Sequence, residues 1–511
     1  MLPETPTAAP ASAGAPVQNA PPAPLHPALQ AVEADLAQDP QSLDLQLRRA
    51  HVLQCLGEEA VAKAAYLRVL QRDPDRLDAL GGLAQLLGRT GFTSAARTLL
   101  ERAVARHPHD LASHVNLAAL RARGGDAQAA QALFEKALQI DPRCPQAHAG
   151  LSLVLDTLGQ AEPARAHRQQ GFGGRSVAEL PYFGTGQPVR VLLLGATNAG
   201  NIPIERHLDP RVFRTWIVTP EFHHAGAPLP AHDLVFNAIG DADAAAAALQ
   251  SARALAGRSA APVINLPAAV AATGRCANWR RMADLPGVVV PRSATLARGV
   301  LAGSAAHEAL ARAGLSFPLL LRSPGYHTGE HFVLVSDSRA LPAAVAALPG
   351  EELIAIEFLD VRNADGLTRK YRVMIVDGAL HPLHLAVARR WKVHYFSADM
   401  AACAAHRDEE ARFLADMPGA LGARAMAALR AVAARLRLDY AGIDFSLDAW
   451  GRVVLFEANA TMVVPEPGAE AHWDYRRAAV GRIDAAIRRM LLARAGAAGR
   501  SCASSENPGS R

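Results

Sequence analysis

Two acidic residues and one amide near the C-terminal end of the sequence have the types and spacing of a metal site. Asp444 lies in one short apolar run, and Glu457 and Asn459 end a second run, with turn-forming residues at 448–451 between them. Two such runs around a turn predict a β-hairpin. Carboxylate and amide oxygens suit Mg²⁺, which binds one or two carboxylates completed by water and nucleotide phosphates.

The register of this hairpin decides which side chains share a face. An even-numbered loop places Leu447 opposite Arg452 and, further along, Asp444 opposite Leu455. Side chains repeat every two residues, so Glu457 then lies diagonal to Asp444 on the same face, with Asn459 beyond it. We therefore expect both carboxylates and the amide oxygen on one surface. The alternative is a solvated strand face that carries ordinary acids.

Two other segments are candidates for contact with an anion. Residues 317–335 predict a second hairpin with a glycine-containing loop, which can cover phosphates with its backbone N–H groups. A flexible turn is the alternative for this loop. Arg372 stands among apolar residues at the start of a predicted strand and is a candidate anion contact, with a surface arginine on an edge strand as the alternative.

Cations and aromatic residues concentrate in residues 388–399, although only 5% of the chain is aromatic. We expect Arg390, Lys392, His394 and Tyr395 in this segment to bind a substrate. A packed loop is the alternative.

Composition limits the class of protein. A chain of 511 residues is expected to form two to four domains, and it has no uncharged apolar run near the ~18 residues of a membrane span. The N-terminus lacks the pattern of a secretory signal, and five widely spaced cysteines favour reduced thiols in the cytoplasm. A net charge of +5 without a basic, aromatic-rich run gives nucleic-acid binding little support. We expect a cytoplasmic protein that binds neither membranes nor nucleic acids.

An internal repeat occupies residues 26–170. Four registers recur every 34 residues: Pro40, Pro74, Pro108 and Pro142; Gly57, Gly91, Gly125 and Gly159; Ala62, Ala96, Ala130 and Ala164; and Ala50, Ala84 and Ala118, with Ser152 in the fourth position. The period predicts paired antiparallel helices, in which glycine marks the turn and proline ends the second helix. The pattern resembles the tetratricopeptide repeat, with three complete units, a leading helix and a partial last unit. This resemblance implies an all-α solenoid that binds a protein or peptide partner. A rigid spacer or dimerisation arm is the alternative.

The rest of the chain predicts mixed α/β structure. Residues 1–25 and 495–511 are expected to be a disordered lead and tail, and the glycines of 171–188 predict a linker. Apolar runs at 189–194, 214–218, 233–238 and 261–265 alternate with helical stretches, which predicts an α/β domain with a parallel sheet over 189–270.

The order of the later pieces resembles an ATP-grasp enzyme. A cation on a helix, a glycine loop between strands, an apolar strand ending in Glu357-Phe-Leu and an arginine strand come before the hairpin. Asp444-Phe-Ser-Leu-Asp and Phe-Glu457-Ala-Asn459 are similar to the metal-ligand strands of D-alanine:D-alanine ligase and glutathione synthetase. The resemblance implies a pre-ATP-grasp domain over 189–270 and an α+β ATP-grasp domain over 271–494.

Carried to this chain, the resemblance implies a role for each matching residue. Asp444, Glu457 and Asn459 would hold Mg²⁺, or Mn²⁺ in its place, against the phosphates of ATP. Arg372 would be the catalytic contact to the transferring phosphoryl group. The ATP contacts would be Arg275, Arg322, Gly325, His327, Thr328, Gly329, Glu357, Phe358 and Leu359. Arg275 and Arg322 occupy positions where the family usually has lysine, and arginine is not its geometric equivalent.

The implied activity is a carboxylate–amine ligase that uses ATP to form an acyl phosphate for attack by an amine. Two alternatives remain open. A kinase on the same fold would pass the phosphate to a hydroxyl, and a catalytically silent scaffold would bind ATP only structurally.

Overall fold

The computed structural model describes residues 27–197, 200–324, 329, 331–393, 395, 398–468 and 470–496. By internal contacts it divides into two compact units, with the boundary between Arg106 and His107. The predicted division into domains at 171–188 and 270 stays a prediction.

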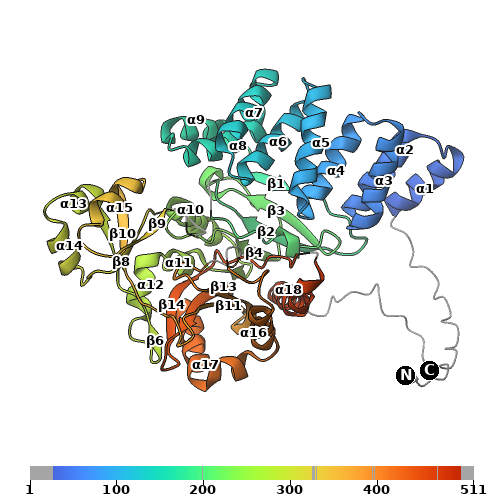
Figure 1. The fold of residues 1–511 in the computed structure, drawn as a ribbon. Helices are drawn as coiled ribbons and strands as arrows, with labels where there is room; N and C mark the ends of the chain where they lie inside the picture. Colours follow the sequence, from blue (N-terminus) through green and yellow to red (C-terminus); the bar gives the residue numbers. More distant parts are fainter. Residues whose placement is uncertain are drawn as a thin grey trace, which may run out of the picture. The chain divides into compact units, whose positions relative to one another are not determined.

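The first unit is all-helical (Figure 1). Its helices are α1 (Pro27–Gln38), α2 (Leu43–Cys55), α3 (Glu59–Arg72), α4 (Leu77–Arg89) and α5 (Thr93–Arg106). The turn from α2 to α3 contains Gly57 at φ 79°, and the turn from α4 to α5 contains Gly91 at φ 86°. Glycine adopts this left-handed conformation without a steric penalty, which explains its 34-residue interval.

The second unit begins with the same helical pattern. Its first helices are α6 (Leu111–Arg123), α7 (Ala127–Ile140), α8 (Pro145–Thr157) and α9 (Ala161–Phe172). The predicted pairing of helices within each repeat is therefore confirmed, and the last unit, expected to be partial, has both of its helices. The small repeat residues are buried as the close crossing of helices requires: Ala118 and Ala130 are both 0% exposed.

A mostly parallel sheet follows, with the order β1-β3-β2-β4-β5. Its strands are β1 (Val177–Glu179), β2 (Val189–Leu194), β3 (Phe213–Val218), β4 (Leu234–Asn237) and β5 (Val263–Ile264). Strands β2 to β5 pair in parallel, as predicted, and β1 joins the edge antiparallel to β3. The stretch predicted as a linker thus contributes a strand. The helices η1 (Glu205–His207), η2 (Pro220–Phe222) and α10 (Ala246–Ala256) connect these strands, and α11 (Pro267–Ala271) follows β5.

A four-stranded antiparallel sheet comes next, with the order β7-β10-β8-β9. Its strands are β7 (Ser293–Ala297), β8 (Leu319–Arg322), β9 (Phe332–Val335) and β10 (Glu352–Glu357). Strands β8 and β9 are the predicted second hairpin. The helices α13 (Arg298–Ala302), α14 (Ala306–Arg312) and α15 (Leu341–Ala347) pack with these strands around a separate apolar core.

The last sheet has five strands in the order β12-β11-β13-β14-β6. They are β6 (Val288–Val289), β11 (Thr368–Val376), β12 (Ala379–Ala388), β13 (Tyr440–Leu447) and β14 (Val453–Asn459). The helices around them are α12 (Arg275–Met282), α16 (Ala404–Ala415), α17 (Met417–Leu436), η4 (Ala471–Trp473) and α18 (Asp474–Arg494). No helix among the described residues is both long and apolar enough to cross a lipid bilayer.

The β13–β14 hairpin forms as predicted, but its predicted register is wrong. Leu447 pairs with Val453, not with Arg452, and Asp444 pairs directly with Glu457 across a bulge at Asp444/Phe445. The cause is the loop, which has five residues, 448–452, because the backbone N–H of Asp448 donates to the Arg452 carbonyl. The extra residue and the bulge bring the two carboxylates opposite each other instead of diagonally.

Candidate functional site

Four polar side chains form a row across the five-stranded sheet. His384 on β12 pairs with Arg372 on β11, Arg372 pairs with Asp444 on β13, and Asp444 pairs with Glu457 on β14. Residues directly opposite each other in a sheet project to the same face. The row therefore joins the predicted catalytic arginine to two of the predicted metal ligands.

Asp444 is fully buried and holds two cations. Its carboxylate accepts hydrogen bonds from Arg372 Nε at 2.6 Å and Arg372 Nη2 at 2.8 Å. Lys370 Nζ lies 2.6 Å from the second oxygen, Oδ2. Burial alone would raise the pKa of Asp444, but Arg372 and Lys370 more than offset it and hold this pKa well below its usual range. Both carboxylate oxygens are thus engaged by protein cations, and the metal-ligand role of Asp444 stays a prediction.

Glu457 and Asn459 lie together beside this pair. Glu457 Oε1 receives hydrogen bonds from Arg275 Nη2 at 3.1 Å and Asn459 Nδ2 at 2.9 Å. Burial opposes ionisation of Glu457, but Arg275 outweighs it, with help from Lys370 and Arg322, and lowers the pKa of the carboxyl. The Glu457 side chain remains 26% exposed, unlike that of Asp444. It is therefore an ionised carboxylate that a ligand can reach.

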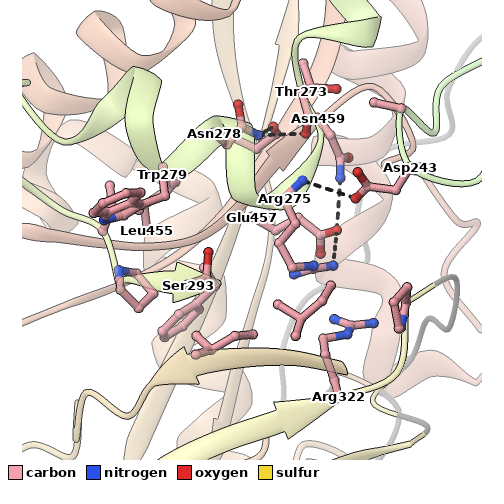
Figure 2. Close-up of a pocket in the computed structure, with 18 of the residues that line it drawn as sticks. Asp243, Thr273, Arg275, Asn278, Trp279, Ser293, Arg322, Leu455, Glu457 and Asn459 are labelled. Carbon is pink, nitrogen blue, oxygen red and sulfur yellow. Dashed lines mark hydrogen bonds and ion pairs between the residues drawn. The ribbon is translucent and has the colours of Figure 1, made fainter. Parts of the chain in front are cut away.

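A cleft opens at Glu457 between the four-stranded and the five-stranded sheet (Figure 2). Its charged lining comes from Asp241, Asp243, Arg275, Arg322 and Glu457, and the Asn459 amide lies beside them. The cavity has a volume of ≈ 80 Å³. This is less than the about 300–1,000 Å³ of a typical ligand pocket. Side chains that line the cleft therefore have to shift for a small molecule to enter.

The apolar lining of the cleft lies on both walls. Ile354 and Ile356 come from β10, Leu455 comes from β14, and Val290 precedes β7. An apolar slot next to convergent charged groups is the usual composition of a ligand pocket.

Arg275 and Arg322 reach the cleft from different elements. Arg275 begins α12, and its backbone N–H donates to Asp243 Oδ2 at 3.1 Å. Arg322 ends β8 on the opposite wall, and it is only 8% exposed. Burial, with repulsion from Arg275, lowers the pKa of Arg322 to about 10, so it stays charged at neutral pH. The structure thus brings together the two arginines that the sequence singled out.

The predicted adenine contacts do not line this cleft. Both oxygens of Glu357 are bound by Arg292, with Nη2 to Oε1 at 3.1 Å and Nε to Oε2 at 3.3 Å. Phe358 lies edge-on to Trp391 at 6.0 Å, and Leu359 is half-buried after β10. The roles of Glu357, Phe358 and Leu359 stay predictions.

Most of the predicted glycine loop lies outside the described residues, including Gly325, His327 and Thr328. Gly329 is described, and it adopts φ 81°. Glycine adopts this left-handed conformation without a steric penalty. A Cβ atom there would lie 2.6 Å from Lys392 Cε, near the flexible end of that side chain.

The predicted substrate segment divides between two locations. Lys392 Nζ donates to the Phe332 carbonyl at 3.1 Å, which ties it to β9, and Arg390 is exposed. Tyr395 instead lies at β12, with its ring 4.7 Å from the His384 ring. His394 lies outside the described residues.

Some residues of the site were missed in the sequence. Lys370 precedes Arg372 by two positions and so shares its strand face, a signal that could have identified it. Glu410 and Arg476 join Tyr395 from α16 and α18, and no local pattern predicts their meeting. Among the described residues, no group of three or more His, Cys, Asp or Glu side chains is arranged to hold a metal ion.

Comparison with known proteins identifies one region. A family model of the tetratricopeptide repeat matches residues 111–144, the span of α6 and α7. The chain therefore contains a tetratricopeptide repeat, as its 34-residue period predicted. No curated protein matches the chain significantly.

Several solved structures are similar to the helical part. A MamA structure is 19% identical and covers 28% of this chain and 84% of its own, with a TM-score of 0.26. A thermophilic tetratricopeptide repeat protein of Thermus thermophilus is 21% identical, with coverages of 28% and 79% and a TM-score of 0.26. A MamA fragment from Desulfovibrio magneticus is 18% identical, with coverages of 28% and 81% and the same TM-score of 0.26.

Proposed function

We propose that this chain is an ATP-dependent carboxylate–amine ligase of the ATP-grasp type. One observation carries the proposal: Arg275 and Arg322 converge on Glu457 and Asn459 in a cleft between the four-stranded and the five-stranded sheet. The order of elements in the sequence and the composition of the cleft therefore point to the same ligand.

The two ends of the cleft suit the two ends of a nucleotide. Ile354, Ile356 and Leu455 offer an apolar slot for a planar base. Arg275 and Arg322 offer guanidinium groups, which bind phosphate oxygens in pairs and stay charged when buried. Because both arginines line a cavity of only ≈ 80 Å³, we expect them to move when the phosphates enter.

The oxygen donors in the cleft fit a magnesium ion only in part. Glu457 supplies an ionised, accessible carboxylate, a hard donor of the kind that Mg²⁺ prefers. The Asn459 amide turns its nitrogen to Glu457 and its oxygen to Thr461, so the amide would have to rotate to offer that oxygen to the ion. Asp444 could join them only if Lys370 released its carboxylate. We assign Glu457 and Asn459 as the residues that would hold the ion. Such an ion neutralises charge on the transferring phosphoryl group.

In the proposed reaction, a substrate carboxylate oxygen attacks the γ-phosphorus of ATP, and the bond to the β-phosphate oxygen breaks with release of ADP. An amine then attacks the acyl carbon, phosphate leaves with the bonding electron pair, and the nitrogen loses a proton to solvent. Arg372 is positioned by Asp444 and would stabilise the negative charge of the transferring group. Arg275 and Arg322 would hold the remaining phosphates.

Glu457→Gln tests the proposal. The full-length protein is incubated with Mg²⁺ and ATP and with pools of metabolites or peptides, and ADP and new conjugates are measured by mass spectrometry. Wild-type protein and Glu352→Gln, a change at an exposed glutamate on β10, should form ADP and an amide product. Glu457→Gln should not. Equal turnover by all three proteins would sink the proposal, and a stable phosphorylated product without an amide would identify a kinase.

A second candidate is a catalytically silent scaffold. It is favoured by the two cations on Asp444 and by arginine at both positions where the family usually has lysine. Binding of Mg²⁺–ATP in calorimetry without formation of ADP in the assay above would identify the scaffold, and absence of nucleotide binding would exclude the ligase.

We further propose that the repeats bind a protein or peptide partner, as tetratricopeptide solenoids typically do. Cross-linking of the full-length chain in cell extract, followed by peptide mapping, tests this. Cross-links that concentrate within residues 26–170 support a docking role, whereas cross-links spread evenly over the chain contradict it.

A further inference from the structure

A buried polar cluster lies at the edge strand β12, outside the cleft. Its members are His384 on β12, Glu410 on α16 and Arg476 on α18, grouped around the ring of Tyr395. Arg476 and His384 are each 4% exposed and Glu410 is 0% exposed. The Arg476 guanidinium carbon lies 4.4 Å from the centre of the Tyr395 ring, and the His384 ring lies 4.7 Å from it.

Glu410 is already well supplied with hydrogen-bond donors. Tyr475 donates its hydroxyl at 2.5 Å, Tyr395 donates at 3.3 Å and the backbone N–H of Leu385 donates at 3.3 Å. Arg476 Nε is only an ion-pair neighbour of Glu410, at 3.5 Å. Burial raises the pKa of Glu410 in spite of Arg476. The Glu410 carboxylate therefore balances the charge of Arg476, but it accepts no hydrogen bond from Nε or Nη2 of the guanidinium.

Three nitrogen atoms in this cluster have no hydrogen-bond partner within the described part of the chain. They are Nε and Nη2 of Arg476 and Nδ1 of His384, all shielded from solvent. Buried polar atoms are nearly always paired, so two guanidinium nitrogens and one imidazole nitrogen without hydrogen bonds beside one ring require an explanation. A bound group with two acceptor oxygens would satisfy the guanidinium, and a carboxylate matches its fork geometry.

The cluster also has a defined place relative to the proposed reaction. His384 is the direct cross-strand partner of Arg372 and ends the row whose other end, Glu457, lies in the cleft. A molecule bound at His384 would therefore lie on the β12 side of Arg372, and a nucleotide in the cleft would lie on its β14 side, beyond Asp444 and Glu457.

We propose that Arg476 and His384, packed against the Tyr395 ring, form a subsite for a carboxylate of the acceptor substrate. The name acceptor rests on the proposed ligase function, whereas carboxylate binding at this subsite does not. Arg476 supplies a bidentate contact to the carboxylate oxygens, and His384 positions the group beside Arg372. The substrate class is thus a carboxylic acid, held at a site separate from the phosphate-binding arginines.

Calorimetry without nucleotide tests the subsite directly, with malonate and glutarate as probes. Wild-type protein and Arg477→Gln should bind at least one of the two. Arg477 is a matched control, because it follows Arg476 on α18 but is exposed. Arg476→Gln should weaken that binding at least about tenfold, as loss of a charged hydrogen-bonding pair does. Equal affinity in Arg476→Gln, or no binding of either probe by the wild-type protein, would overturn the proposal.

A second variant separates loss of carboxylate binding from failure of Arg476→Gln to fold. Arg476→Met combined with Glu410→Gln removes both charges of the buried pair, so that neither is left alone in the interior. It should fold, bind Mg²⁺–ATP as the wild-type protein does, and lose carboxylate binding at least about tenfold. Carboxylate binding that depends on Arg476 without any binding of ATP would retain the subsite and reject the ligase. ATP turnover together with carboxylate binding that this double change does not affect would retain the ligase and reject the subsite.

Discussion

Arg372 and Asp444 lie directly opposite each other on β11 and β13 and are joined by two hydrogen bonds of 2.6 and 2.8 Å. Asp444 is also the partner of Lys370, so one buried carboxylate balances two cations. Removing one member of a buried charge cluster leaves the others uncompensated in a medium of low polarity. Asp444 therefore stabilises the sheet by balancing the charges of Arg372 and Lys370, with or without a bound ligand.

Asp444→Asn should therefore be strongly destabilising. We expect it to lower the free energy of unfolding by about 3–5 kcal/mol, the cost of breaking a buried ion pair. All five tryptophans lie between residues 216 and 473, so denaturant unfolding followed by tryptophan fluorescence reports on the α/β region and not on the repeats. Asp408→Asn, at an exposed position on α16, should change the stability by less than about 0.5 kcal/mol.

The charge explanation can be separated from a packing explanation. Lys370→Met in the Asp444→Asn background removes one of the stranded cations, so it should recover part of the lost stability. If the double variant is less stable than Asp444→Asn alone, charge imbalance is not the cause of the loss.

A buried histidine predicts loss of stability in mild acid. Burial, and secondarily Arg206, lowers the pKa of His207 to about 4, against the opposing effect of Asp484. The ordinary pKa is ≈ 6.5. As the pH falls, His207 is therefore protonated in the unfolded chain before it is protonated in the folded protein. Its contribution to the free energy of unfolding is complete above about pH 6.5 and is lost as the pH falls towards 4. Between pH 7 and pH 5 this group should cost about 2 kcal/mol.

The His207 prediction is checked with His207→Gln. Urea unfolding of the wild-type and variant proteins is followed by tryptophan fluorescence at pH 7 and pH 5. The variant should lose about 2 kcal/mol less than the wild-type protein over this interval. Parallel losses in the two proteins would assign the acid sensitivity to other groups.

The repeats and the buried strands could be predicted because each depends on local pattern. Gly57 and Gly91 indicate turns, because their left-handed conformation is unfavourable for other residues. The apolar run at 189–194 indicates a strand that is buried on both faces. The hairpin register could not be predicted in the same way. It depends on the Asp448–Arg452 hydrogen bond and a bulge, which the apolar alternation does not encode.

The candidate site was predictable where its residues share a strand. Glu457 and Asn459 are two positions apart and do lie together. The contacts of Tyr395 were not predictable, because they depend on how α16 and α18 pack against β12. Lys392, close to Tyr395 in sequence, contacts β9 instead.

Variants of Arg322 test whether its positive charge is sufficient for its contribution to nucleotide binding. Its guanidinium reaches the cleft from β8 and is largely buried. Arg322→Met should weaken Mg²⁺–ATP binding about tenfold or more, because a charged contact to phosphate contributes roughly 1.5–3 kcal/mol. Arg322→Lys keeps the charge and should lose much less. Calorimetry measures the affinity of both variants for Mg²⁺–ATP, and Arg312→Met, on the exposed face of α14, is the control. Equal affinity in Arg322→Met and wild-type protein would show that Arg322 does not bind the nucleotide.

Two adjacent glycines on α4 give a matched test of the packing within the repeats. A Cβ atom on Gly82 would lie 2.6 Å from the Tyr66 ring, whereas one on Gly81 would meet nothing within 4 Å. Gly82→Ala should therefore destabilise the helices by about 1–3 kcal/mol through overpacking. Gly81→Ala should stabilise them by about 0.5–1 kcal/mol, because alanine is the better helix former. Thermal unfolding followed by far-ultraviolet circular dichroism should move in opposite directions for the two variants, and a shared direction would mean that the Tyr66 contact does not govern this helix pair.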